Sequence, residues 1–114
     1  MTNSPRIREK GDEKNMISVI AKIFLNPGQA AVLENDVKAL AEKVAGEEGT
    51  LFYTVNADKK APDTLVFMER YRDMAALKKH SGTAYFQEFM GKVLPVMAKP
   101  PEIAVLEELL SAKS

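Results

Sequence analysis

Residues 65–89, LVFMERYRDMAALKKHSGTAYFQEF, decide the fold of this chain. The apolar pattern at its start predicts a strand, and Asp73 is a residue type that caps helices, so a short helix should follow through Lys79. Ser81-Gly82 interrupts the helical pattern, and Thr83 is a second cap, ahead of an amphipathic helix. His80, the only histidine of the chain, falls where the first of these two helices ends.

The other elements follow from apolar periodicity on either side of this stretch. The expected elements are strands at residues 16–25, 50–56, 64–71 and 103–109, a helix at 29–45, the two helices that follow Asp73 and Thr83, and a polar turn at 57–63. The order β-α-β-β-α-β predicts a ferredoxin-like α+β fold with a four-stranded antiparallel sheet and helices on one face.

The chain length of 114 residues fits a single domain, which we expect at residues 16–110. Residues 1–15 are charged and contain Pro5 and Gly11, with Ile7 as the only large apolar residue after Met1. Such a segment buries too little to offset its ordering entropy, so we expect a flexible N-terminal tail, and residues 111–114 form a short C-terminal tail.

Composition excludes several classes of protein. The 16 basic and 16 acidic residues give zero net charge, which argues against a nucleic-acid-binding protein. The chain has no cysteine, so it has neither disulfides nor a zinc–thiolate site. No apolar run approaches the ~20 residues that span a membrane, and the polar N-terminus lacks a signal-peptide core, so we expect a cytoplasmic protein.

The first strand, MISVIAKIFL at residues 16–25, is apolar on both faces. Ile17 and Val19 lie on one face, while Ile20 and Phe24 lie on the other. A strand of this kind is covered on both sides, and one short chain has helices for only one of them. The sequence therefore predicts a homodimer, in which a second copy covers the other face of the sheet.

The order of Glu69-Arg70-Tyr71, His80 and Tyr85-Phe86 resembles the antibiotic biosynthesis monooxygenase (ABM) family, over about residues 16–109. This resemblance implies a dimeric α+β barrel. It also implies that the protein is a cofactor-free enzyme, because many ABM proteins oxygenate phenols without a cofactor. The expected substrate is a quinol or a polyketide-type phenol, which reacts with dioxygen.

The resemblance directs attention to His80, because ABM proteins commonly carry a histidine at this place in the helix, facing a pocket. We expect His80 to be the catalytic base, since its ordinary pKa lies near neutrality. The residues expected to bind the substrate are Tyr53 and Tyr71 as donors, Glu69 beside His80, and Phe67, Tyr85, Phe86 and Met90 as pocket walls. The alternative interpretation is that His80 is a solvated residue at a helix end and that the aromatic residues are ordinary core.

The residue types also bear on cofactors. One histidine without cysteine cannot supply a tetrahedral zinc site or an iron site of two histidines and a carboxylate. The six glycines are scattered and form no phosphate-binding loop. Threading onto the haem-degrading branch of the ABM family places Ala21, His80 and Met90 where that branch has Asn, Trp and a ligating His. We therefore expect neither a metal nor a cofactor.

Two other functions fit the same residues. A proton-transfer isomerase would use the same histidine and pocket without consuming oxygen. A non-catalytic dimeric module would bind a small apolar ligand without turnover.

Overall fold

The computed structural model describes residues 15–113 of the chain. In chain order the elements are β1 (Ile17–Phe24), α1 (Gln29–Val32), α2 (Glu34–Val44), β2 (Thr50–Asp58), β3 (Ala61–Tyr71), α3 (Met74–Ser81), α4 (Ala84–Val93), the 3₁₀ helix η1 (Leu94–Val96) and β4 (Glu102–Glu107). Within the described residues, four strands form one antiparallel sheet in the order β2-β3-β1-β4. The predicted ferredoxin-like α+β fold is confirmed.

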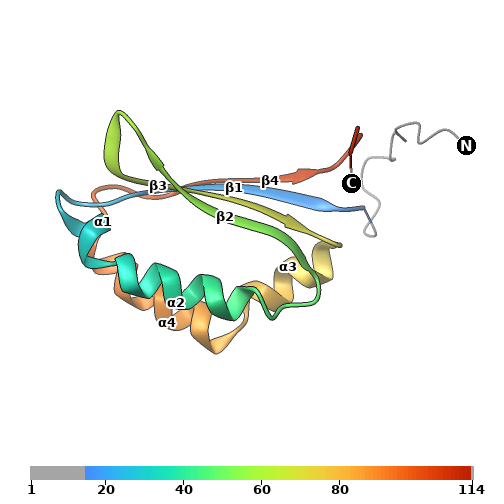
Figure 1. The fold of residues 1–114 in the computed structure, drawn as a ribbon, viewed down its shortest axis with the longest axis horizontal. Coiled ribbons are helices and arrows are strands. Elements are labelled where there is room, and N and C mark those ends of the chain that lie inside the picture. Colours follow the sequence, from blue (N-terminus) through green and yellow to red (C-terminus); the bar gives the residue numbers. More distant parts are fainter. Residues whose placement is uncertain (1–14, 114) are drawn as a thin grey trace, which may run out of the picture.

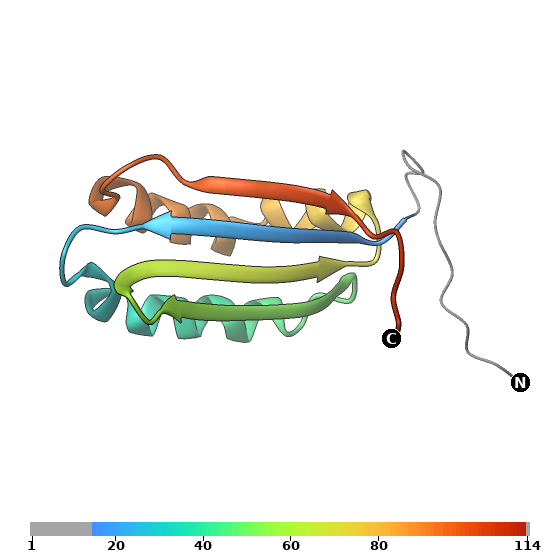
Figure 2. The same cartoon turned by 90° about the horizontal axis from the view of Figure 1, so that it is seen from above.

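The molecule has two layers, with the helices on one face of the sheet (Figure 1). Seen from above, α2 runs beneath β2, while α3 and α4 run beneath β1 and β4 (Figure 2). The core lies between the layers and contains Ile23 of β1, Phe67 of β3, Leu40 and Val44 of α2, and Phe89 and Val93 of α4. No helix among the described residues is long and apolar enough to cross a membrane.

The predicted N-terminal tail lies outside the described residues, with the exception of Asn15, which is 3% exposed. At the other end, β4 stops at Glu107, two residues earlier than predicted. Residues 111–113 of the predicted C-terminal tail have no regular secondary structure.

The predicted helix at 29–45 is two helices, because the backbone turns at Leu33, where ψ is 1°. Asp63 of β3 holds the start of α1 in place: its carboxylate accepts hydrogen bonds from the backbone N–H groups of Gly28 (3.1 Å) and Ala30 (3.0 Å). The first segment therefore follows β3, whereas α2 packs along β2. The Leu33 side chain is buried in the core at the junction between the two helices.

The predicted turn at 57–63 is wrong. The strand β2 continues to Asp58 and β3 begins at Ala61, so the turn consists of Lys59 and Lys60. The register shifts between Ala57 and Asp58, and such a bulge allows Pro62, which has no N–H donor, to lie within a strand. The strong Pro and Asp turn signals thus mark an irregular hairpin end rather than a long loop.

The sheet face away from the helices carries large apolar side chains. Ile20 and Met68 face each other across β1 and β3, and both alternate with buried inner-face residues. Phe52 of β2 and Leu106 of β4 lie on the same outer face. These four side chains are between 36% and 49% exposed. Several large apolar side chains exposed on one face often mark a surface that binds another protein.

Gly49, just before β2, allows the chain to pass very close to α3. A Cβ built on Gly49 would lie 2.6 Å from the Cβ of Ala76. Its carbonyl accepts a hydrogen bond from the N–H of Arg72, which ties the chain to the end of β3 (2.9 Å). The absence of a side chain at this position therefore sets the distance between α3 and the loop that follows α2.

Replacement of Gly49 by alanine should destabilise the protein, because the added methyl group has to displace α3. Overpacking of this kind costs about 1–3 kcal/mol, which urea-induced unfolding would detect. Gly91→Ala in α4 is the control, since its Cβ would meet nothing within 4 Å. That variant should be neutral or more stable by up to about 1 kcal/mol. Equal stability of the two variants would contradict the packing argument.

Candidate active site

A cavity of about 200 Å³ lies between the inner face of the sheet and helices α3 and α4. Its walls are mostly apolar and come from all four strands and both helices. The lining includes Ala21, Phe67, Leu77, Phe89, Met90 and Val105. The polar side chains that reach it are few, and His80, Glu69 and Tyr53 are the ones with titratable groups. An apolar cavity with a few convergent polar groups is the usual form of a small-molecule site.

His80 lies in the last turn of α3. Asp73 caps this helix as predicted: its carboxylate accepts a hydrogen bond from the N–H of Ala76 (2.8 Å). The interpretation of His80 as a solvated helix-end residue is wrong, because its side chain is only 2% exposed. The helix layer and the sheet enclose it. Its ring centroid lies 5.4 Å from those of Tyr53 and Tyr71 and 4.9 Å from that of Phe86.

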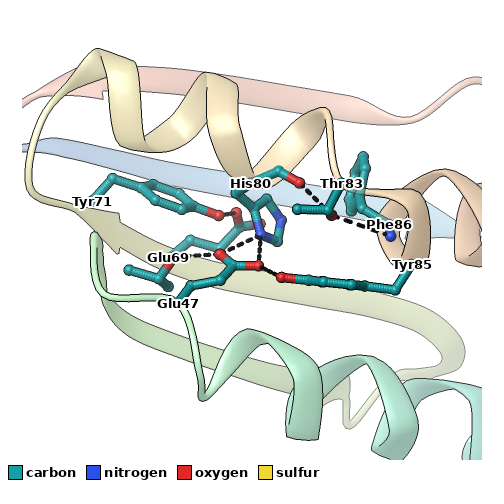
Figure 3. A network of polar contacts seen from close by, with 8 residues as sticks. Glu47, Glu69, Tyr71, His80, Thr83, Tyr85 and Phe86 are labelled. Carbon is teal, nitrogen blue, oxygen red and sulfur yellow. Dashed lines mark hydrogen bonds and ion pairs between the residues drawn. The ribbon is translucent and has the colours of Figure 1, made fainter.

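The partner of His80 is Glu47, a residue that the sequence analysis did not identify. His80 Nδ1 lies 2.9 Å from Glu47 Oε1 and 3.1 Å from Oε2. Glu47 lies in the loop between α2 and β2, 33 residues before His80. The Tyr85 hydroxyl donates to Oε2 of the same carboxylate, so Glu47 lies between the two side chains (Figure 3). No periodic pattern marks Glu47 in the sequence; the one local sign is a pair of carboxylates between two glycines, in Gly46-Glu47-Glu48-Gly49.

The other ring nitrogen of His80, Nε2, is buried and forms no hydrogen bond with any described residue. An ionised Glu47 can only accept, so Nδ1 carries a proton and a neutral ring keeps its lone pair on Nε2. Nδ1 faces Glu47, which does not line the cavity, so we infer that Nε2 is the nitrogen available to the cavity. This arrangement can take a proton or accept a hydrogen bond from a bound molecule.

Glu69, which the sequence analysis placed beside His80, forms no hydrogen bond with it that the structure records. It instead accepts a hydrogen bond from the Tyr71 hydroxyl (Figure 3). Burial raises the pKa of the Glu69 carboxyl, and the hydrogen bond from Tyr71 offsets only part of this effect. Burial also raises the pKa of the Tyr53 and Tyr71 hydroxyls, so both remain protonated.

The structure brings six of the eight expected site residues to the cavity. His80, Tyr53, Phe67, Glu69, Phe86 and Met90 line it. Tyr71 and Tyr85 do not: Tyr71 is fully buried, with its hydroxyl on Glu69, and Tyr85 points its hydroxyl to Glu47. Ile103 and Val105 of β4, which the sequence analysis did not assign to the site, complete the wall and are 62% and 49% exposed. Within residues 15–113, no group of three or more His, Cys, Asp or Glu residues is arranged to hold a metal ion.

The raised pKa of Glu69 should make the stability of the protein depend on pH. The folded state binds this proton more tightly than the unfolded state, so its contribution to stability is present at low pH. That contribution is lost as the pH rises from the ordinary carboxyl range through the raised pKa. The Glu69→Gln variant cannot ionise but keeps an acceptor for Tyr71, so its stability relative to the wild type should increase with pH.

Urea unfolding of both proteins at about pH 4 and about pH 8 measures this difference. The exposed carboxylate of Glu42 on α2 supplies the control variant Glu42→Gln. If the Glu69→Gln variant and the wild type differ by the same amount at both pH values, the carboxyl is not perturbed by burial.

The fold and sequence have clear relatives. The profile of the family described as antibiotic biosynthesis monooxygenase matches residues 16–92. The crystal structure of a putative antibiotic biosynthesis monooxygenase from Caulobacter crescentus CB15 matches with a TM-score of 0.79 and 36% sequence identity, over 85% of this chain and 92% of that chain. The putative monooxygenase YcnE of Bacillus subtilis is 28% identical over 92 residues, which are 81% of this chain and 97% of that protein.

The uncharacterized protein sll1783 of Synechocystis is also 28% identical, over 99 residues that make up 87% of this chain. The match covers only 56% of the length of sll1783. The family profile runs from β1 through most of α4, so it includes His80, Glu47 and most of the cavity wall. The chain therefore belongs to the antibiotic biosynthesis monooxygenase family.

Proposed function

We propose that this protein is a cofactor-independent monooxygenase that oxidises a quinol or polyketide-type phenol with dioxygen. The observation that carries the proposal is the buried Nε2 of His80, which has no hydrogen-bond partner among the described residues. It belongs to a residue on the wall of an apolar cavity. A buried polar atom without a partner is costly in a folded protein, and its retention is explained if a substrate hydroxyl supplies the missing partner.

The reaction begins when His80 Nε2 takes the acidic proton of the substrate. The resulting anion gives one electron to dioxygen, and the radical pair joins to form a peroxide at a ring carbon that carries hydrogen. The peroxide loses water, with the proton returned by the imidazolium, and leaves a carbonyl. One oxygen atom of dioxygen ends in the product and the other in water, so the substrate is the only reductant.

The surroundings of His80 suit these steps. Tyr53 lines the cavity and stays protonated because burial raises its pKa, so its hydroxyl can donate to the substrate anion. The apolar walls formed by Phe67, Phe86 and Met90 exclude water and accept a flat aromatic ring. A small aromatic substrate is therefore the class that this cavity fits.

A proton-transfer isomerase is the alternative enzyme. Glu69 favours it, because burial raises the pKa of this carboxyl and it lines the same cavity as His80. A carboxyl and an imidazole in one cavity can act as an acid and a base on a carbonyl compound. A non-catalytic module that binds a small ligand is the remaining alternative, and it would show binding without turnover.

Oxygenation of a naphthohydroquinone or an anthrone by the purified protein tests the proposal. We expect uptake of isotopically labelled dioxygen into the product, unaffected by a chelator and without added flavin. The His80→Gln variant keeps a donor for Glu47 but has no base, so its rate should fall by ~10²–10⁴-fold. A rate within about threefold of the wild type would remove His80 from the reaction. Product without incorporated label would favour the isomerase.

We also propose that the protein is a homodimer that buries the outer face of the sheet. Ile20 and Met68 lie on the two central strands of this face, and interfaces of stable dimers are apolar at their centre. The outer surface of one sheet would then face that of its partner. The sequence predicted the dimer for the same reason: β1 is apolar on both faces, and the helices of one chain cover only one of them.

Sedimentation equilibrium should find a dimer of the 12.6 kDa chain at micromolar concentration. Met68→Lys, which places a charge on the outer face, should produce monomers, because a buried unpaired charge costs several kcal/mol. Val32→Lys is the matched control, since Val32 is 67% exposed on α1, in the helix layer. A folded monomer for the wild type, or monomers from the control, would rule out this interface.

A further inference from the structure

A second hollow lies on the other side of His80. It has a volume of about 560 Å³ and is bounded by the loop between α2 and β2, by α3 and by the start of α4. We call it the polar cleft; its charged and polar lining includes Lys43, Glu47, Glu48, Arg72, Lys79 and Tyr85. Among the residues that line the apolar cavity, His80 alone also lines the polar cleft. The imidazole thus separates an apolar chamber from a charged one.

Glu47 belongs to the polar cleft and not to the cavity. Its carboxylate is held by three donors from three parts of the chain: His80 Nδ1, the Tyr85 hydroxyl and the Thr50 hydroxyl, which lies 2.6 Å from Oε1. These bonds fix the orientation of the carboxylate, and the side chain is only 15% exposed. A carboxylate held in one orientation can determine which ring nitrogen of the imidazole carries the proton.

We propose that Glu47 is a positioning residue that holds the Nδ1 proton of His80, so that the basic lone pair lies on Nε2, facing the cavity. Its negative charge also stabilises the imidazolium that forms when Nε2 takes a proton. Glu47 therefore acts through His80 and does not touch the substrate. The second of these roles rests on the proposed function, whereas the tautomer is a property of the protein without any ligand.

The polar cleft gives this arrangement a further property. Three basic residues, Lys43, Arg72 and Lys79, lie on the cleft that gives access to Glu47. They favour the entry of a small anion from solvent. If the Glu47 side chain is removed, a carboxylate the size of formate should therefore enter from the cleft and take its place beside Nδ1.

The tautomer can be observed directly, because His80 is the only histidine of the chain. Long-range nitrogen–proton NMR spectra of the wild type at alkaline pH should show one neutral imidazole with the proton on Nδ1. Glu47→Leu has no acceptor for Nδ1, so the Nε2–H form should appear in this variant. Glu48→Gln changes the neighbouring carboxylate of the same cleft and should leave the spectrum unchanged. An Nε2–H tautomer in the wild type, or an unchanged spectrum in Glu47→Leu, would overturn the proposal.

Kinetics test the second role with the same naphthohydroquinone. The kcat of Glu47→Ala should fall by ~10²-fold or more, with KM nearly unchanged, and added formate should restore part of the rate. The Glu47→Leu variant fills the space and should not respond to formate. Loss of rate without rescue in Glu47→Ala would mean that Glu47 supports the fold only. If no quinol is oxygenated by the wild type while the NMR result holds, the proposed function fails and the positioning role stands.

Discussion

The buried contact between His80 and Glu47 is the interaction on which the arrangement of the site depends. It joins the end of α3 to the loop before β2, two segments that are 33 residues apart. An imidazole that is 2% exposed needs a partner for its N–H, because an unpaired buried donor costs about as much as a lost hydrogen bond. Glu47 supplies that partner for Nδ1 only, and Nε2 is left without a hydrogen-bond partner among the described residues.

The packing of the two layers explains why a cavity remains beside this contact. The helix α2 follows β2 closely, whereas two separate helices, α3 and α4, lie beneath β1 and β4. Gly82 interrupts the chain between them, and Thr83 caps the second helix. These two helices leave space above β1 and β4, and Ile103 and Val105 remain exposed on the inner face of β4. The same strands carry apolar residues on the outer face, because side chains alternate along each strand. One sheet therefore presents a core and cavity on one side and an apolar surface on the other.

Much of the fold followed from local patterns in the sequence. Apolar alternation and the caps at Asp73 and Thr83 predicted the strands and the two helices around His80, and the structure has both caps. Besides the early end of β4, the predicted boundaries are wrong at Leu33 and at the β2–β3 hairpin. In both, a tertiary contact overrides the local signal: Asp63 ties down α1, and sheet pairing extends through the bulge at Pro62.

The sequence by itself determined the element order and the ferredoxin-like fold, because periodicity and capping depend on neighbours along the chain. Only the tertiary structure decided which carboxylate pairs with His80. Glu69 was the expected neighbour, yet its carboxylate pairs with Tyr71, whereas Glu47 reaches His80 from a loop without periodicity. That contact depends on how closely the start of β2 approaches α3, a distance set by the missing side chain of Gly49 against Ala76. The distance between two packed segments is not encoded in any periodic sequence pattern.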